Sequence, residues 1–255
     1  MAAVISAYEP KRSAAGHARW LRVSHWFLAA SVLTLAFSGF VILMAHPRLY
    51  WGHAGNDLMP AFLELPISRN YQHGGWAPAT TFFSGSDSVV SAVRTYDIFN
   101  KNGWARSLHF LAAWFLIATG LIYWTAGLAG GHLRRDIVPR LRDLAPRAIW
   151  HDIRAHLRWP QPEASGGLPY APLQKLAYAG VVFVLLPLMV LTGMTMSPAI
   201  TAALPGLLDL LGGSQSARTL HFFSFTALVL FFIIHVVMVV LTGFRRQIRS
   251  MTLGG

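Results

Sequence analysis

Four long apolar stretches limit what this chain can fold into. They lie at about residues 20–44, 105–130, 172–197 and 217–243, and each is long enough to cross a hydrocarbon core of about 30 Å as a helix. A helix is required there because lipid offers no partner to an unpaired backbone amide. Of the 255 residues 54% are hydrophobic and only 12% are charged, which is unlike an ordinary soluble domain. The sequence therefore predicts an all-α membrane protein, a bundle of four transmembrane helices in a single domain over residues 1–255.

The basic residues predict how the four spans are oriented. They cluster before the first span, after the second and after the fourth, as Lys11, Arg12, Arg19 and Arg22, then Arg134, Arg135, Arg140, Arg142, Arg147, Arg154 and Arg158, then Arg245, Arg246 and Arg249. By the positive-inside rule both termini and the basic loop 131–171 are cytoplasmic, and the loops 45–104 and 198–216 lie outside. Because the net charge of +11 follows this division, it does not indicate nucleic-acid binding.

Both long loops carry apolar residues. The outer loop 45–104 is longer than a helix connection needs, and its aromatic content predicts order, with packing at the membrane interface or against a partner: Tyr50, Trp51, Phe62, Tyr71, Trp76, Phe82 and Phe83. The inner loop mixes arginines with apolar residues at near-helical spacing. Two interpretations stay open for it, a basic helix lying on the anionic inner leaflet or an ordinary basic loop with some helix.

Four histidines lie within the apolar stretches, where ionisable side chains are costly and usually mark a functional site. They are His25, His109, His221 and His235. At about 100° and 1.5 Å per residue, the fourteen-residue interval in the last stretch puts His221 and His235 within about 40° of one face and about 21 Å apart along the axis. One helix can therefore serve two sites, one near each membrane surface.

The orientation of the spans predicts which histidines lie near the same membrane surface and can form pairs. His109 and His221 both open their spans from the outside and form a predicted outer pair, whereas His25 near the inner surface pairs with His235 as the inner pair. Zinc is disfavoured because its ligands converge on one point. The chain has no cysteine, which excludes iron–sulfur clusters and covalently attached c-type haem. The sequence therefore predicts two b-type haems, with these histidines as axial ligands to the iron.

Arginines and glycines accompany the histidines. Arg22, Arg106 and Arg218 each lie three residues before a histidine, on the same helix face, where a guanidinium can bind a haem propionate. Gly39 and Gly120 lie on nearly the same faces as the first two histidines, at the depth of the other haem, and are predicted to clear room for a macrocycle. The alternative is that these glycines only aid helix packing, as is common in membrane proteins.

These features resemble the four-helix dihaem cytochrome b subunits of bacterial respiratory oxidoreductases. That superfamily includes the cytochrome b subunits of formate dehydrogenase, nickel–iron hydrogenase and thiosulfate reductase. The resemblance rests on one histidine in each of the first two spans, two histidines fourteen residues apart in the fourth, and none in the third. The outer-loop sequences Arg48-Leu49-Tyr50-Trp51-Gly52 and Leu65-Pro66 look most like the thiosulfate-reductase branch.

The resemblance implies electron transfer in the bacterial inner membrane between a periplasmic redox subunit, with a molybdopterin enzyme as one candidate, and the quinone pool. It also implies a quinone near the inner haem, at the start of the third span. Gln174 and Lys175 match a family Asn-x-Gly-Gln-Lys pattern there, but residues 171–173 depart from it. Gln174, Lys175 and Tyr178 are the candidate quinone ligands, and the alternative is that they are interfacial anchors.

Two other functions remain open from the sequence. One is a free-standing dihaem cytochrome that oxidises superoxide and reduces quinone, although such relatives are compact and the long outer loop favours a partner. The other is a transporter whose histidines relay protons without haem. In the leading interpretation the chain is an electron-transfer subunit without a substrate site of its own.

Overall fold

The computed structural model describes residues 17–56, 58–68, 102–140, 144–157 and 172–254. Within these residues four helices are long and apolar enough to cross a membrane, namely Arg19–Ala45, Gly103–Ala129, Pro172–Thr195 and Ser214–Leu241. Their ends differ from the predicted stretches by three residues or fewer. The prediction of an all-α protein with four membrane-spanning helices is confirmed to this extent.

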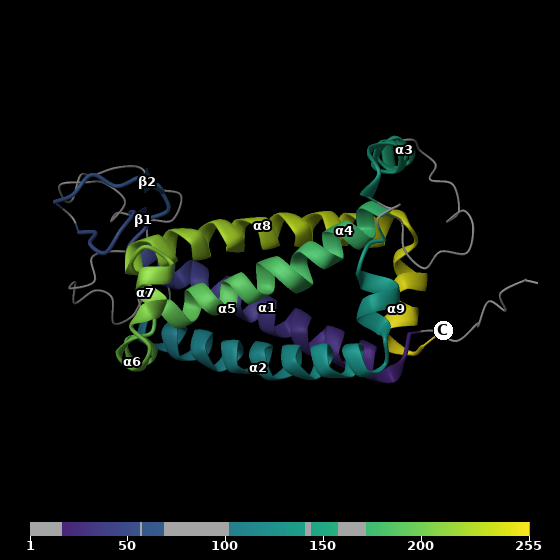
Figure 1. The fold of residues 1–255 in the computed structure, drawn as a ribbon, viewed down its shortest axis with the longest axis horizontal. Helices are drawn as coiled ribbons and strands as arrows, with labels where there is room; N and C mark the ends of the chain where they lie inside the picture. The colour runs from purple at the N-terminus through teal and green to yellow at the C-terminus, as the bar shows by residue number, and fades with distance from the viewer. Residues whose placement is uncertain (1–16, 57, 69–101, 141–143, 158–171, 255) are drawn as a thin grey trace, which may run out of the picture. The chain divides into compact units, whose positions relative to one another are not determined.

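Three of the spans are single α-helices, α1 (Arg19–Ala45), α2 (Asn102–Ala129) and α8 (Ser214–Leu241), whereas the third is divided (Figure 1). It consists of α4 (Pro172–Gly180), the π-helix η6 (Val181–Leu185) and α5 (Leu186–Thr195). Pro187 lies two residues after the end of η6. Proline has no amide hydrogen, and its ring clashes with the carbonyl four residues earlier, so the preceding turn opens.

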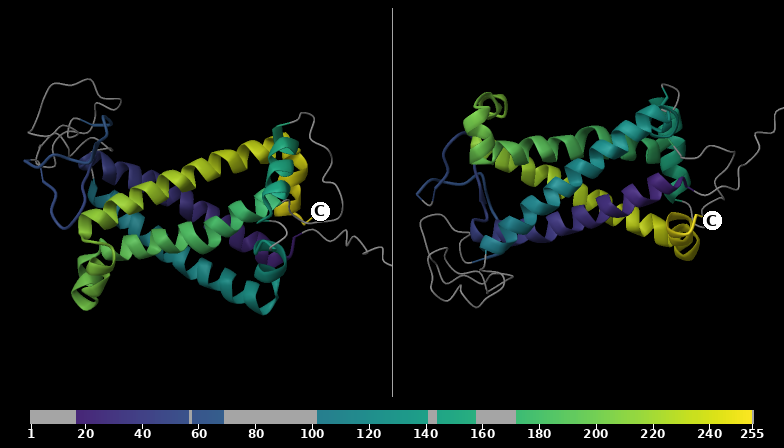
Figure 2. Two further views of the ribbon diagram at one scale, coloured as in Figure 1. Left: turned by 45° about the horizontal axis from the view of Figure 1, so that its top comes forward. Right: turned by 90° about the horizontal axis from the view of Figure 1, so that it is seen from below.

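The remaining elements are short. They are η4 (Leu133–Ile137), α3 (Pro146–Leu157), α6 (Pro198–Ala203), α7 (Gly206–Leu210), α9 (Phe244–Thr252) and the strands β1 (Arg48–Leu49) and β2 (Leu63–Glu64). Figure 2 shows α6 and α7 between the end of α5 and the beginning of α8.

The chain divides into two compact units. The terminal unit comprises Met1–Trp26, Tyr123–Ala179 and Ile233–Gly255, and the central unit comprises Phe27–Ile122 and Gly180–Phe232. Each of the four long helices contributes one segment to each unit. Both units are therefore built from the same four helices, and each has its own packing.

In the central unit the described part of the outer loop packs on the beginning of α8. β1 pairs with β2 in antiparallel register. The Thr219 hydroxyl donates to the Tyr50 carbonyl at 2.7 Å, and the Ser216 hydroxyl accepts from the Gly52 amide at 2.8 Å. The Gly52 carbonyl in turn accepts from the Gln215 amide at 3.0 Å. The loop thus satisfies amides that a helix N-terminus leaves free, and this part of the loop is ordered.

The predicted aromatic order of the outer loop is tested for only some of its residues. Tyr50 is buried, with 3% of its surface exposed, whereas Trp51 and Phe62 form an edge-to-face pair with centroids 5.5 Å apart. The remaining aromatic residues of that prediction lie outside the described residues, namely Tyr71, Trp76, Phe82 and Phe83.

In the terminal unit two short helices are tied to the ends of long ones. α9 follows a left-handed Gly243 and lies beside the first turns of α1 (Figure 1), where Trp26 Nε1 donates to the Met251 carbonyl at 2.9 Å. The Asp152 carboxylate of α3 accepts from the Leu173 amide at 2.8 Å, at the N-terminus of α4. A negative charge at a helix N-terminus is stabilising. The inner loop therefore contains a helix, and its contact with lipid stays a prediction.

Candidate functional site

The central unit brings together the histidines of the predicted outer pair. His109 comes from α2 and His221 from α8. Their ring centroids lie 6.4 Å apart, and the ring planes differ by 60°. The two imidazoles are therefore neighbours, and no direct hydrogen bond joins them in the structure.

A buried hydroxyl contacts each histidine of the outer pair. Ser38 Oγ lies 3.0 Å from His109 Nδ1, and Thr192 Oγ1 lies 2.8 Å from His221 Nδ1. Both hydroxyl residues are 0% exposed. The two hydroxyls thus come from α1 and α5, which provide no histidine to this pair.

A glycine follows each of these hydroxyl residues in the sequence. A Cβ at Gly39 would lie 3.3 Å from His109 Cε1, and a Cβ at Gly193 would lie 3.5 Å from His221 Cε1. The first contact is tighter than ordinary packing, and the second is an ordinary contact. Gly39 therefore lets α1 approach the His109 ring closely.

The terminal unit brings together the predicted inner pair. The centroids of His25 and His235 also lie 6.4 Å apart, with ring planes 51° from parallel. The ring of Trp26 meets His25 edge-on at 5.3 Å. Within the described residues, Nδ1 of His25 is buried and has no hydrogen-bond partner. The two pairs thus share one spacing but differ in what supports their rings.

The three candidate quinone ligands lie in the same unit as the inner pair. The Tyr178 ring lies 6.4 Å from that of His235, and the Gln174 amide donates to the Tyr178 hydroxyl at 2.9 Å. Lys175 is only 3% exposed. Gln174 and Tyr178 are therefore next to the inner pair, and their contact with a quinone stays a prediction.

The three predicted propionate arginines have different surroundings. Arg22 donates to the Thr252 carbonyl of α9 at 2.9 Å, and Arg218 donates to the His46 carbonyl. Arg106 is exposed. A guanidinium has five N–H donors, so these bonds leave capacity for a carboxylate, and the propionate role stays a prediction.

The second predicted clearance glycine, Gly120, borders open space. A Cβ there would meet no atom within 4 Å. The structure thus places Gly39 against an imidazole and leaves open space at the position of a Cβ on Gly120.

The spacing within each pair allows a direct test of fit to a haem. A metal–imidazole nitrogen bond is about 2.0 Å long and the nitrogen lies about 1.2 Å from its ring centre, so two imidazoles in line on one metal have centroids about 6.4 Å apart. Both pairs have this separation. Within the described residues no three histidine or acidic side chains come together as a metal site. Two histidines at this separation could hold a metal whose other ligands would come from a macrocycle.

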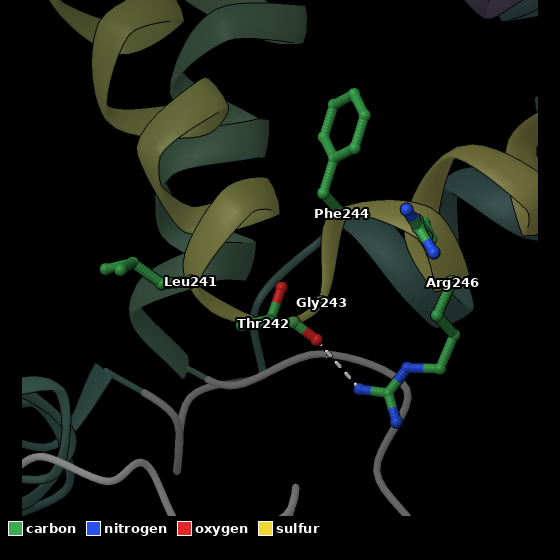
Figure 3. Close-up of a pocket in the computed structure, with 6 residues that line it drawn as sticks. Leu241, Thr242, Gly243, Phe244 and Arg246 are labelled. Atoms are coloured by element: carbon green, nitrogen blue, oxygen red, sulfur yellow. Dashed lines mark hydrogen bonds between the residues drawn. The ribbon is translucent and has the colours of Figure 1, made fainter.

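Two further features of the terminal unit lie apart from these pairs. The His132 ring contacts Trp20 and Tyr123, and its Nδ1 lies 2.7 Å from an Asp136 carboxylate oxygen. A pocket also lies at the turn between α8 and α9, over residues 241–246 (Figure 3). None of the predicted site residues lines it.

The contacts of Ser38, Thr192 and Gly193 with the outer pair were not predicted from the sequence, and Gly39 was predicted to have a different role, clearance for a macrocycle. The available signal was a repeated dipeptide, Ser38-Gly39 in the first span and Thr192-Gly193 in the third. It is weak, because hydroxyl residues commonly bond to their own helix in membranes. Only the tertiary contacts show that both dipeptides face a histidine.

Four helices long and apolar enough to cross a membrane, which bring histidines together in two pairs, define the class of polytopic membrane proteins. Residues 16–254 match the family model described as prokaryotic cytochrome b561, and the chain belongs to this family. It is therefore a membrane electron-transfer cytochrome with b-type haem. The cytochrome b superfamily predicted from the histidine pattern is confirmed.

Two relatives match over much of their length. One, from Azospira oryzae, is named "Putative protein-methionine-sulfoxide reductase subunit YedZ1" and is 30% identical over 225 residues, which cover 88% of this chain and 90% of that protein. The other, from Cupriavidus necator, is named "Probable Ni/Fe-hydrogenase B-type cytochrome subunit" and is 30% identical over 174 residues, or 62% of this chain and 67% of that protein. No solved structure matches the chain significantly.

Proposed function

We propose that this cytochrome holds two b-type haems, one between His109 and His221 and one between His25 and His235. Haems bound in this way supply one-electron carriers, and the chain links a periplasmic redox subunit to the quinone pool. We propose the bacterial inner membrane as its location, with both termini and the basic loop 131–171 in the cytoplasm. The outer pair then lies near the periplasmic surface and the inner pair near the cytoplasmic surface.

One observation carries the proposal. The two histidine pairs belong to different units, yet both have the 6.4 Å centroid separation of two imidazoles that share one metal. This separation is the one expected in both places if each pair holds one metal. The absence of cysteine from the sequence fits haem that is held only by its axial ligands and packing.

Other side chains of this protein are proposed to bind the haem propionates and the quinone. Arg22 and Arg218 keep donors available for propionates while they bind backbone carbonyls of neighbouring segments. We propose Arg106, which is exposed, as a third propionate contact at the beginning of α2. Gln174, Lys175 and Tyr178 form the proposed quinone site beside His235, supported by the contact of Tyr178 with that ring.

The proposed partner is a periplasmic oxidoreductase subunit. The names of both relatives describe subunits of oxidoreductases, a methionine-sulfoxide reductase and a hydrogenase. The described outer loop also exposes apolar side chains, with Trp51 at 49%, Phe62 at 57% and Leu58 at 84%, as a docking surface needs. A molybdopterin enzyme remains one candidate, and the thiosulfate-reductase branch rests on the loop sequence alone.

The test is haem stoichiometry in purified protein. We expect two haems per chain, b-type bands in the reduced-minus-oxidised spectrum, and one haem left after His221→Ala or His235→Ala. His151→Ala is the control, because His151 is exposed on α3. Absence of haem from protein supplied with haem would refute the proposal, and loss of both haems from either single variant would refute the pairing.

The free-standing alternative is tested with the same preparation. Rapid quinone reduction by the wild-type protein with superoxide as the only donor would favour that function over a partner-dependent subunit. Under our proposal, reduction requires electrons from a periplasmic redox protein, and superoxide alone supports little turnover.

A further inference from the structure

The two hydroxyls of the outer pair make matching contacts. Ser38 Oγ donates to the carbonyl of Thr34 at 2.8 Å, and Thr192 Oγ1 donates to that of Leu188 at 2.7 Å, in both cases four residues earlier. A hydroxyl has one proton to donate. With that proton used on its own helix, the oxygen can only accept from the histidine that it contacts.

This arrangement selects one form of each imidazole. If the hydroxyl oxygen accepts, the histidine carries its proton on Nδ1, and Nε2 keeps the lone pair that a metal requires. Ser38 and Thr192 are 0% exposed, so water does not compete for these bonds. The hydroxyls therefore fix both the protonated nitrogen and the rotation of each ring.

We propose that Ser38 and Thr192 are positioning residues for the haem held by His109 and His221, and that they lower its reduction potential. A hydrogen bond from Nδ1–H increases the basicity of the ligating nitrogen, which favours oxidised over reduced iron. The proposal rests on the assignment of these two histidines as ligands. Each ring also has a hydrogen bond with the backbone of the helix that carries its hydroxyl, at Leu35 for His109 and at Met189 for His221, so a hydroxyl-deletion variant measures what the hydroxyl adds to that bond.

The inner pair provides the internal comparison. Nδ1 of His25 is buried without a hydrogen-bond partner in the described part of the chain. Both histidines of the outer pair have a hydroxyl at Nδ1, and His25 of the inner pair has none among the described residues. This difference favours a lower potential for the outer haem than for the inner one.

The experiment is a spectroscopic redox titration of full-length protein in detergent. Ser38→Ala and Thr192→Val remove one hydroxyl each, whereas Ser38→Thr and Thr192→Ser keep it. Ser31→Ala and Thr226→Val are matched controls, because their hydroxyls bond to their own helix carbonyls at 2.8 and 2.9 Å. The outer component is identified as the one that His221→Ala removes.

We expect the outer component alone to change. At a fixed ambient potential its ratio of reduced to oxidised haem should rise by up to about tenfold for each hydroxyl removed, a shift of about 59 mV for one electron. The low-spin ferric EPR signal of that haem should also broaden, because its rings lose their fixed rotation. The conservative variants and the controls should keep the wild-type potential.

Several outcomes would overturn the proposal. They are unchanged potentials in both hydroxyl-deletion variants, equal shifts of both haems, and shifts as large in the Ser31 and Thr226 controls. If a deletion variant loses the outer haem, retention in its conservative partner supports positioning, and loss in the controls as well contradicts it. Wild-type protein without haem would refute the proposed function itself, which separates that failure from this one.

Discussion

Replacing Gly213 by alanine should detach the outer loop from the beginning of α8. Gly213 has a φ of +107°, and a Cβ there would lie 2.4 Å from the Gly52 carbonyl oxygen and 2.5 Å from its carbon. Both contacts are with backbone, so no side-chain rotation can relieve them. The variant must therefore shift the two segments apart.

The size of the effect follows from what this shift breaks. The Gly52 carbonyl accepts from the amides of Gln215 at 3.0 Å and Ser216 at 3.3 Å, and the Gly52 amide donates to the Ser216 hydroxyl at 2.8 Å. Losing these three bonds, at about 1 kcal/mol each, with about 1–2 kcal/mol for a side chain in a left-handed backbone, gives a destabilisation of about 4–5 kcal/mol.

The neighbouring glycine supplies a matched control. Gly212 also has a positive φ, +71°, but a Cβ there would meet nothing closer than the Ser216 hydroxyl at 3.6 Å. Gly212→Ala should therefore carry only the backbone strain, about 1–2 kcal/mol. The difference of about 3 kcal/mol between the variants corresponds to about a hundredfold in a local opening equilibrium.

Hydrogen–deuterium exchange of peptides that cover residues 213–219 measures this opening directly. The amides of Gln215 and Ser216 should exchange about a hundredfold faster in Gly213→Ala than in Gly212→Ala. Equal protection in the two variants would show that the backbone contact at Gly213 does not hold the loop, and the reasoning would fail.

Three further predictions concern the terminal unit. Asp152→Ala removes the carboxylate that accepts from the Leu173 amide, and it should lower the free energy of unfolding by about 1 kcal/mol. The measurement is the melting temperature, which should decrease; an unchanged melting temperature would contradict this prediction. Tyr178→Phe keeps the ring beside His235 but loses the hydrogen bond from Gln174. Quinone reduction should therefore slow at constant haem content. An unchanged rate would show that the Tyr178 hydroxyl is not part of the quinone site. Burial, then the charges of His132 and Arg22, lower the pKa of His17 below its usual 6.5. The unfolded chain therefore binds more protons as pH falls through about 6.5, and stability decreases there; His17→Gln should reduce this loss, and the same pH dependence in the variant would refute the assignment.

The spans and the histidine pairs could be predicted because each gives a strong local signal. A run of about 20 apolar residues has few alternatives to a membrane helix, and an ionisable side chain within such a run is rare. Helix periodicity and charge asymmetry then suffice to decide which histidines can meet. These are properties of a single helix and its ends, which a sequence contains in full.

The surroundings of the arginines could not be predicted in the same way. The repeated Arg-x-x-His spacing suggested one role for Arg22, Arg106 and Arg218. In the structure Arg22 binds the end of α9, Arg218 binds the His46 carbonyl and Arg106 is exposed. Short connecting segments decide these contacts, and spacing within one helix carries no information about them.

The third span shows how a helix without a histidine contributes to both units. Its sequence contains no histidine, so pattern reasoning could assign it only the quinone candidates near its beginning. In the central unit Thr192 and Gly193 contact His221, and in the terminal unit Tyr178 contacts His235. Both histidines of α8 therefore have a partner on this one span. If the third span only filled space, Thr192→Val and Tyr178→Phe would have no separate effects; we expect the first to change a haem potential and the second to change quinone turnover.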